Sequence, residues 1–595
     1  MTSNHQINRG ECMNSHIKER AVEWTRAPFD EETRKEIALL IERGDDGELE
    51  DRFHTMLEFG TGGLRGVIGA GTNRMNVYTV GMATQGLANY ILARKRQENG
   101  VVIARDSRRM SDIFSREVAC ILAGNGIHAY YFNDIAPTPL CSFAIRDLKA
   151  VSGIVVTASH NPPEYNGYKV YWEDGGQVVP PVDGEIIDEV RMIHSIEAIK
   201  RIDFEEGVRA GIITIIGDDI VQNYLSLLES RVLRPAKPSE TAIVYTPLHG
   251  TGYRIIPAVL RHFGFTNIFP VESQSRPDGN FPTVRSPNPE EREALTLALE
   301  LARKVDADII LATDPDSDRM GVGIKNPRGD YDLINGNQIG TMLEYYLLHR
   351  LSQKGSLPSN AAIVKTIVTT DLQDVIARSY NCTVDNVLTG FKWIAMKMRE
   401  YESSGERSFV FGGEESYGYL PLDFVRDKDA ISSCYYFAEM ADWLAQSGST
   451  LYEFLNAIYL KYGLYLEDLL SMTMKGMDGM ERIRLIMESF RRKAPAEFGG
   501  IRVSRIADYL SLVEISSNSG STAAIKGIPS SDVLQFFLED GSKITMRPSG
   551  TEPKIKFYFS VNARVAADDL EGAKSVLHER IERFKTDLAS KVNAV

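Results

Sequence analysis

Short apolar runs alternate with longer amphipathic segments from Gly60 onward, and this alternation constrains the fold of the chain more than any other feature. The runs are apolar at successive positions, so both faces of each predicted strand need to be covered. Helix-length segments separate them, which is the spacing of sheets covered by helices. The pattern predicts an α/β fold with parallel or mixed sheets. The clearest strands are predicted over 101–105, 153–159, 242–247, 307–314 and 408–415.

The chain has 595 residues, which is too long for one hydrophobic core and predicts about four domains at roughly 150 residues each. Changes in texture near 203–219, 326–329 and 476–500 suggest the boundaries. Apolar side chains of Ile37, Leu40 and Ile41 share one helical face, so helices are expected before Gly60. We therefore predict an N-terminal helical extension packing on the first domain (1–59), three α/β domains (60–215, 216–330 and 331–475) and a C-terminal α+β domain (476–595).

Charge and cysteine content limit the partners and the compartment. Lys and Arg number 67 against 81 Asp and Glu, a net charge of −14, which disfavours binding to nucleic acid or to an anionic membrane. The five cysteines are scattered and form no CxxC pair, and no apolar run is long enough to span a bilayer. We expect a cytoplasmic protein with a small-molecule substrate and neither nucleic-acid nor membrane partners.

Three aspartates follow the predicted strand over 307–314 at alternate positions: Asp314, Asp316 and Asp318. Two carboxylates about 4 Å apart repel by roughly 4 kcal/mol at an effective dielectric constant near 20, so their convergence favours a bound cation. A hard divalent ion such as Mg²⁺ suits these oxygen ligands. A solvated turn is the alternative, because Asp and Pro are common turn residues.

A second motif, TASHNPPEYNGYK, carries Ser159, His160 and Lys169 after another predicted strand. A serine can carry a phosphoryl group covalently, and a phosphoserine needs a cation and hydrogen-bond donors close by. His160 and Lys169 are candidate donors, and an ion at the aspartates is a candidate cation. The alternative is that the serine and asparagine only turn the chain.

Two further loops have the composition of ligand-binding sites. RPSGTEPKIK contains Arg547, Ser549, Gly550, Thr551 and Lys556, which combine charge, hydroxyl groups and an open backbone as a phosphate site requires. FGGEES places two carboxylates and a serine at the end of a predicted strand, where they suit sugar hydroxyl groups. Nucleotide signatures are missing: Arg65 stands where a G-x-G-x-x-G fingerprint needs its last glycine, and no G-x-x-x-x-G-K-[ST] loop occurs.

TASHNP, DPDSDR, GEESYG and RPSGTEPK, in this order, resemble the motifs of the α-D-phosphohexomutase superfamily, and the resemblance covers most of the chain. GTGGLRG and TGFKW are similar to the phosphoglucomutase branch related to phosphopentomutases. The resemblance implies four domains around a central cleft, three of them α/β with mixed sheets and a C-terminal α+β domain, with one motif from each.

The resemblance also implies the roles of individual residues. Ser159 would carry the phosphoryl group and contribute, with Asp314, Asp316 and Asp318, to binding Mg²⁺. Lys169 or Lys392 would act as general base, and His160 would lie beside the serine. The substrate would contact Arg65, Arg319, Thr389, Glu414, Ser416, Lys428, Arg547, Ser549, Gly550, Thr551 and Lys556.

The activity implied by the resemblance is that of a phosphoglucomutase, which interconverts glucose 1-phosphate and glucose 6-phosphate. Glucose 1,6-bisphosphate would be the intermediate and activator, and the enzyme would be a monomer or homodimer. Alternatives within the superfamily are a phosphopentomutase, a phosphomannomutase and a glucose 1,6-bisphosphate synthase. Outside it, a sugar-phosphate binding protein would have an unmodified serine, and a haloacid-dehalogenase-like phosphotransferase would need a DxDxT motif early in the chain.

Overall fold

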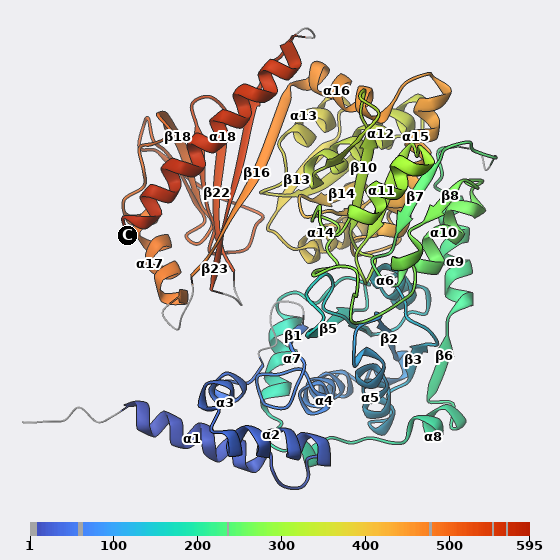
Figure 1. Ribbon diagram of the computed structural model, residues 1–595, viewed down its shortest axis with the longest axis vertical. Helices are drawn as coiled ribbons and strands as arrows, with labels where there is room; N and C mark the ends of the chain where they lie inside the picture. The colour runs from blue at the N-terminus through green and yellow to red at the C-terminus, as the bar shows by residue number, and fades with distance from the viewer. Residues whose placement is uncertain (1–8, 58–62, 235–236, 475–478, 550–552, 567–568) are drawn as a thin grey trace, which may run out of the picture.

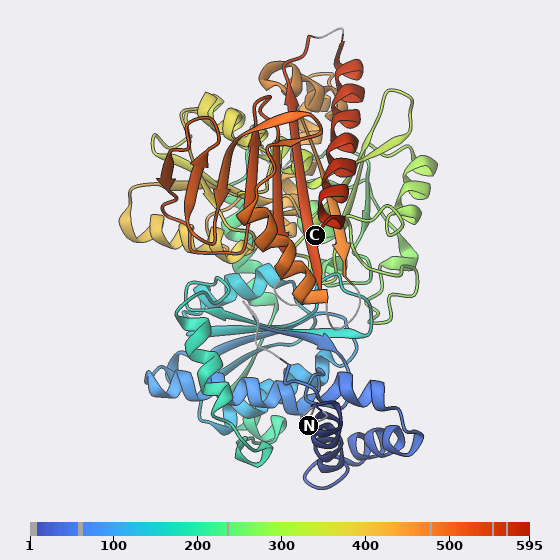
Figure 2. The ribbon, with the colours of Figure 1, turned by 90° about the vertical axis from the view of Figure 1, so that its left-hand side faces the viewer.

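The computed structural model describes residues 9–57, 63–234, 237–474, 479–549, 553–566 and 569–595. Within these residues the chain forms four sheets, and the strands of each sheet come from one continuous stretch of the sequence (Figure 1). The first sheet lies at one end of the molecule, and the C-terminal sheet stands above it beside the third (Figure 2). Three mixed α/β units and a C-terminal antiparallel sheet with helices confirm the predicted fold class.

Six strands form the first sheet, in the order β1-β5-β4-β2-β3-β6. They are β1 (Gly63–Val67), β2 (Val101–Arg105), β3 (Ala129–Phe132), β4 (Ser152–Val156), β5 (Tyr165–Trp172) and β6 (Ile213–Ile216). Strands β3, β2 and β4 run parallel, and β5 is antiparallel to β4 and β1. The helices of this unit are α4 (Val77–Ala93), α5 (Ser111–Gly124), α6 (Thr138–Asp147), α7 (Val182–Arg191) and α8 (Phe204–Arg209).

Strand β2 shows why these runs are apolar throughout. Val101 and Ile103 belong to one hydrophobic core, and Val102 and Ala104 belong to another. Alternate side chains of a strand point to opposite faces, so both faces of this strand are buried.

The second sheet has the order β11-β10-β9-β7-β8. Its strands are β7 (Ile243–Thr246), β8 (Ile268–Pro270), β9 (Ile309–Thr313), β10 (Met320–Lys325) and β11 (Tyr331–Ile334), and its helices are α9 (Asp218–Glu229), α10 (Gly252–His262) and α11 (Thr296–Val305). The turn at 326–329, which suggested a domain boundary, joins β10 to β11 as an antiparallel hairpin. The second sheet therefore extends to Ile334, because the Asn-Pro-Arg-Gly turn reverses the strand without ending the sheet.

The third sheet has the order β13-β12-β14-β15. Its strands are β12 (Ala361–Thr366), β13 (Thr383–Val387), β14 (Ser408–Glu414) and β15 (Gly418–Leu420). Helices α12 (Gly336–Gln353), α13 (Leu372–Ser379), α14 (Phe391–Ser404), α15 (Ala430–Gln446) and α16 (Leu451–Tyr462) complete this unit.

The C-terminal sheet is antiparallel and has the order β16-β23-β22-β21-β18-β19-β20, with β17 paired to β18. Its strands are β16 (Leu464–Thr473), β17 (Glu497–Phe498), β18 (Ile501–Asp508), β19 (Val513–Ser516), β20 (Thr522–Ala524), β21 (Leu534–Leu538), β22 (Lys543–Pro548) and β23 (Lys554–Ala563). Helices α17 (Gly479–Arg492) and α18 (Leu570–Asn593) belong to the same unit. Strand β16 pairs with β23 along its whole length, so this sheet begins before the predicted boundary at 476.

The N-terminal segment contains three helices, α1 (Arg9–Glu23), α2 (Glu31–Arg43) and α3 (Asp46–Phe53), beside the first sheet (Figure 2). The ring of Trp24 packs edge-on against the rings of Phe53 and Tyr78, and Tyr78 belongs to α4. The Tyr78 hydroxyl donates to Asp30 Oδ2 at 2.6 Å, which adds a polar contact to the apolar one. None of the helices in the described part of the chain is both long and apolar enough to cross a membrane.

Candidate active site

Ser159 lies in the loop that follows β4, and its side chain points toward the second sheet. Its Oγ donates a hydrogen bond to Asp314 Oδ2 at 2.7 Å and lies 3.2 Å from Nδ1 of His160. The residue is 3% exposed and has a φ of 53°, in the left-handed region that non-glycine residues rarely adopt. Such backbone strain concentrates at functional sites and needs a surrounding structure that holds it.

His160 is half-buried beside the serine. Burial, and next the positive charges of Arg319 and Arg65, hold the pKa of its imidazole well below the usual range. A neutral imidazole can form the hydrogen bond with Ser159 Oγ without adding a charge to the site. Its backbone carbonyl accepts a hydrogen bond from the Ser286 hydroxyl at 3.0 Å, which fixes the loop from the second sheet's unit.

The three aspartates follow β9 and are buried together, with one oxygen of each within 4.8 Å of the others. Asp314 Oδ1 accepts the backbone N–H groups of Asp318 and Arg319, both at 3.1 Å. Burial, and next the charges of Asp316 and Asp318, raise the pKa of Asp314 well above its usual value. The negative charges of the three carboxylates therefore oppose the ionisation of Asp314, the aspartate that contacts Ser159.

Two lysines approach the same aspartates from elements distant in sequence. Lys169 Nζ of β5 donates to Asp316 Oδ2 at 2.7 Å and to Asp318 Oδ2 at 3.2 Å, and Lys428 Nζ lies 3.2 Å from Asp318 Oδ2. Burial alone raises the pKa of Asp318, but the two lysine charges outweigh it and hold that pKa well below its usual range. Burial alone lowers the pKa of Lys169, but the Asp316 and Asp318 charges raise it.

The aspartate cluster fits a metal ion. Within the described residues, Asp316 Oδ1 and Asp318 Oδ1 are buried and accept no hydrogen bond, although a buried carboxylate oxygen normally has a partner. Three carboxylates are a hard oxygen donor set, which suits a divalent cation such as Mg²⁺. Asp318 Oδ1 has a 3.7 Å ion-pair contact with Arg319 Nε. The lack of hydrogen bonds to these two oxygens and the raised pKa of Asp314 both point to a cation at this position.

The unit of the third sheet contributes the carboxylate of Glu414 and a backbone carbonyl that binds an arginine of the second unit. Glu414 ends β14, and its Oε1 accepts the N–H of Gly390 at 2.8 Å, which brings the loop carrying Thr389 beside it. Arg319 Nη1 donates to the Ser416 carbonyl at 3.0 Å and to Glu290 Oε1 at 2.9 Å. The arginine next to the aspartates thereby connects the second and third units.

The C-terminal sheet presents a basic pair on neighbouring strands. Arg547 of β22 stands directly opposite Lys556 of β23. Like charges at directly opposed positions are destabilising unless an anion lies between them. Burial lowers the pKa of Lys556, the charge of Glu415 opposes the shift, and the charge of Arg547 adds to it. Of the other predicted residues of this loop, Ser549 is described, whereas Gly550 and Thr551 lie outside the described residues.

Two predicted site residues, Arg65 and Lys392, contact residues other than the three aspartates. Arg65 Nη1 of β1 donates to Asn161 Oδ1 at 3.4 Å, in the serine loop. Lys392 of α14 is buried, its Nζ lies 3.9 Å from Asp183 Oδ2, and no hydrogen bond of this nitrogen is found among the described residues. Burial lowers the pKa of Lys392, against the effect of Asp183. The structure thus brings Lys169 to the aspartates and Lys392 to the junction with α7.

Sequence reasoning missed Asp106, Arg108 and Thr138. Thr138 begins α6 and donates its N–H to the Asp316 carbonyl at 2.9 Å and its hydroxyl to Asp316 Oδ2 at 3.1 Å. Asp106 and Arg108 follow β2 and contact the serine loop. The available signal was RDSRR immediately after an apolar strand, because charged residues at strand ends are typical of α/β ligand sites.

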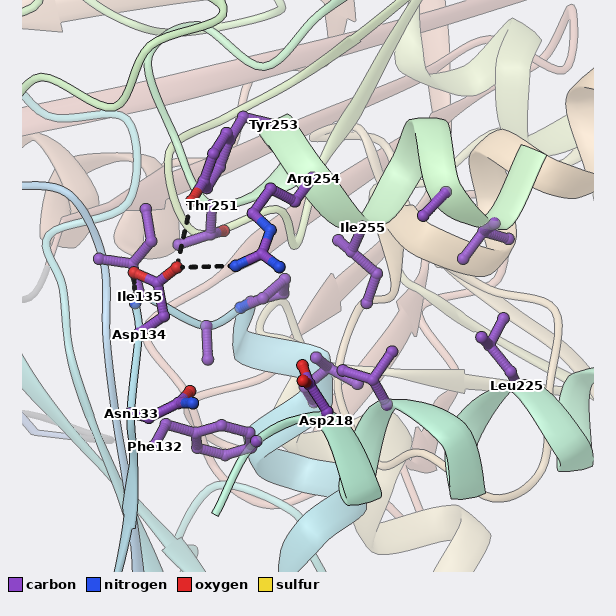
Figure 3. A pocket seen from close by; sticks show the side chains of 17 residues that line it. Phe132, Asn133, Asp134, Ile135, Asp218, Leu225, Thr251, Tyr253, Arg254 and Ile255 are labelled. Carbon is purple, nitrogen blue, oxygen red and sulfur yellow. Dashed lines mark hydrogen bonds and ion pairs between the residues drawn. The ribbon is translucent and has the colours of Figure 1, made fainter. Parts of the chain in front are cut away.

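A pocket of about 170 Å³ lies between the end of β3 and helices α9 and α10 (Figure 3). Asp134 at its rim accepts hydrogen bonds from the Tyr253 hydroxyl at 3.1 Å and from Arg254 at 3.3 Å. Thr251, also in its wall, donates its N–H to the Pro315 carbonyl at 2.8 Å. The described residues that line this pocket include none of the predicted site residues.

A buried serine beside three carboxylates and several positively charged side chains is the arrangement expected of an enzyme that transfers phosphoryl groups. Models of the phosphoglucomutase/phosphomannomutase family match the chain: alpha/beta/alpha domain I over 56–197, domain II over 222–329 and domain III over 335–462. These matches cover more than half of the sequence. The chain belongs to the phosphoglucomutase/phosphomannomutase family.

Curated relatives agree with the family models. A phosphoglucomutase of Staphylococcus haemolyticus is 37% identical over 513 residues, covering 86% of this chain and 92% of the relative. A phosphoglucomutase of Staphylococcus aureus is 36% identical over 526 residues, covering 88% and 93%.

Solved structures share the fold at lower identity. A putative phosphomannomutase from Thermus thermophilus has a TM-score of 0.66 and 21% identity, covering 91% of this chain and 99% of its own. The open form of a Paramecium phosphoglucomutase has a TM-score of 0.63 and 16% identity, covering 89% and 96%. These structures support the four-unit architecture.

Proposed function

We propose that the protein is a phosphoglucomutase, which interconverts glucose 1-phosphate and glucose 6-phosphate through a phosphorylated Ser159 and glucose 1,6-bisphosphate. The observation that carries the proposal is the 2.7 Å hydrogen bond from Ser159 Oγ to a buried cluster of three aspartates. The curated phosphoglucomutases that resemble the chain over most of its length support the choice of sugar. Serine-dependent conversion of glucose 1-phosphate tests it.

In the first half of the reaction, the phosphoryl group leaves Ser159 Oγ and bonds to the free hydroxyl oxygen of the sugar monophosphate. The hydroxyl proton passes to a base and the Oγ left by the phosphoryl group takes up one proton, so the net change moves one proton from the sugar hydroxyl to Ser159. Lys169 and Lys392 are the two candidate bases, and each needs to lose its own proton to act. The contacts of Lys169 with two aspartates favour its charged form, whereas the burial of Lys392 favours its neutral form.

In the second half, the bisphosphate presents its other phosphate to Ser159 and returns that phosphoryl group to Oγ. The Oγ proton replaces it on the sugar oxygen, which leaves the isomeric monophosphate. The intermediate has to turn over, so the far phosphate site needs to accept either end of the sugar. Arg547, Ser549, Gly550, Thr551 and Lys556 are assigned to that site, because charge and hydroxyl donors hold a phosphate without requiring one sugar shape. Arg65, Arg319, Thr389, Glu414, Ser416 and Lys428 are assigned to the sugar and its reacting end.

The metal assigned to the aspartate cluster is Mg²⁺, which Asp314, Asp316 and Asp318 would hold together with an oxygen of the phosphorylated Ser159. When bound, it neutralises negative charge on the transferring group. The reducing cytoplasm is the proposed location, and a monomer or homodimer the proposed assembly.

Removal of the metal should abolish turnover reversibly. EDTA takes away the charge that offsets three buried carboxylates and a phosphoryl group, so we expect activity to fall to background and to return with added Mg²⁺. Following glucose 6-phosphate formation before and after Mg²⁺ is restored measures this. Undiminished turnover in EDTA, after dialysis against the chelator, would contradict the metal assignment.

Arg547→Ala should act on binding more than on chemistry. The loss of a charge-assisted contact worth roughly 1.5–3 kcal/mol predicts a KM increase of about tenfold to a hundredfold, with a smaller change in kcat. Steady-state kinetics on glucose 1-phosphate measures both constants. Arg502→Ala, which changes an exposed arginine of the same sheet, is the matched control. An unchanged KM in the Arg547 variant would remove this loop from the substrate site.

A further inference from the structure

We propose that Arg108 is the positioning residue that holds Ser159 in its reactive conformation, an inference that rests on the proposed role of Ser159 as phosphoryl carrier. Arg108 follows β2 and is 3% exposed. It contacts the backbone of the serine loop, so it acts through Ser159 and not on the substrate.

The Arg108 guanidinium binds four carbonyl groups, three in the serine loop between β4 and β5 and one at the first residue of β5. Nη2 donates to the Ser159 carbonyl at 2.6 Å and to the Asn161 carbonyl. Nη1 donates to the Pro162 carbonyl at 2.8 Å and to the Tyr165 carbonyl at 3.1 Å. A planar guanidinium with donors in a fixed fork can hold several acceptors at once, whereas a lysine ammonium offers one compact point charge.

Asp106 holds the other side of Ser159. Thr157 donates its hydroxyl to Asp106 Oδ2 at 2.6 Å, and the Thr157 oxygen accepts the N–H of Ser159 at 2.8 Å. Arg108 Nε lies 3.3 Å from the same carboxylate oxygen. The N–H and the carbonyl of Ser159 are therefore both fixed by a buried ion pair from the end of the neighbouring strand.

The second unit closes over this ion pair. The ring of Phe281 lies with its centroid 4.9 Å from the Arg108 guanidinium carbon, and Arg108 forms a β-bridge with Gly279. A Cβ on Gly279 would lie 2.4 Å from the backbone nitrogen of Arg109, so only glycine allows this approach. Water has little access to the guanidinium, and the four carbonyls would lose their donor if Arg108 were replaced.

The geometry explains how Ser159 keeps a φ of 53° while its Oγ stays directed at Asp314. Without the arginine, the loop loses the contacts that over-determine its backbone, and Oγ is free to move from the aspartates. In-line phosphoryl transfer depends on that placement, and a displacement of about 1 Å can lower the rate about a hundredfold.

The test compares Arg108→Met with Arg109→Met in the full-length protein. Arg109 is the matched control, because it is exposed and, within the described part of the chain, its guanidinium donates only to the Pro163 carbonyl of the same loop. Three quantities are measured for each variant: the melting temperature, kcat and KM on glucose 1-phosphate, and the hydrogen-exchange rates of the backbone amides of residues 159–161. If Arg108→Met does not fold, Arg108→Lys takes its place, since it keeps the charge but not the fork.

For the Arg108 variant we expect kcat to fall about a hundredfold with KM within about threefold of wild type, and faster exchange of the loop amides. The Arg109 variant should match wild type in all three. Wild-type kcat and wild-type exchange in a folded Arg108 variant would overturn the inference. A wild-type protein inactive on every sugar phosphate would instead refute the proposed function, and the exchange rates would still decide whether Arg108 fixes the loop.

Discussion

Replacement of Ser159 by alanine should lower turnover of glucose 1-phosphate by about 10⁴-fold or more, the scale found when an enzyme loses its nucleophile. The variant lacks the only atom assigned to carry the phosphoryl group. It also loses the 2.7 Å hydrogen bond to Asp314, but the carbonyl and N–H contacts of the loop remain available. We therefore expect a folded protein whose melting temperature is close to that of wild type.

A coupled assay of glucose 6-phosphate formation measures the effect, and intact-protein mass spectrometry reports the phosphoryl group. The wild type should gain the mass of one phosphoryl group after incubation with glucose 1,6-bisphosphate, and the variant should not. Ser195→Ala, at an exposed serine that caps a short helix, controls for the loss of a hydroxyl group. Wild-type turnover by Ser159→Ala would exclude the phosphoserine mechanism.

Asp316→Asn should weaken metal binding by about a hundredfold or more and reduce activity in proportion at low Mg²⁺. Changes to groups that only support metal ligands already cost about 10–100-fold, and here a ligand charge is lost. The asparagine has one neutral carbonyl oxygen where the aspartate has two charged ones, of which Oδ1 accepts no hydrogen bond within the described residues. It also leaves Lys169 with one carboxylate partner, Asp318.

Titration calorimetry with Mg²⁺ and activity as a function of Mg²⁺ concentration test this prediction together. Saturating Mg²⁺ should restore part of the activity, because the site keeps Asp314 and Asp318. Glu300→Gln, an exposed acidic residue of α11, is the control for a change in net charge. If the Asp316 variant bound Mg²⁺ as tightly as wild type, the metal site would have to lie elsewhere.

The sequence predicted the positions of the strands best where both faces of a strand are buried. The predicted strand over 101–105 coincides with β2, and the run over 408–415 contains β14 with Glu414 at its end. The run over 153–159 extends past the end of β4 at Val156, because Ser159 adopts a left-handed backbone that no apolar pattern indicates. Helix α1 lies within the helical extension predicted over 1–59, but its bounds were not predicted, since its sequence has few apolar residues to reveal a buried face.

Contacts between distant segments account for what could not be predicted. Lys428 reaches Asp318 from a loop of the third unit, and Arg319 reaches the Ser416 carbonyl. Both contacts depend on how the sheets pack against each other, which local periodicity does not encode. The pairing of β16 with β23 joins segments about ninety residues apart. Local periodicity does not indicate such a pairing, so the predicted boundary at 476 lies after the true start of the last sheet. The motifs predicted the candidate site residues, whereas the contacts of Arg108 and Asp106 with the loop around Ser159 could be seen only in the structure.

One measurement tests the central claim most directly: Mg²⁺-dependent isomerisation of glucose 1-phosphate, ribose 1-phosphate and mannose 1-phosphate by the wild-type protein, with and without the matching sugar bisphosphate. The account predicts the highest kcat/KM on glucose 1-phosphate, with turnover stimulated by glucose 1,6-bisphosphate. A preference for the pentose or for mannose would contradict the assigned substrate but keep the phosphoserine chemistry. No isomerisation of any of the three sugars would contradict the mutase itself.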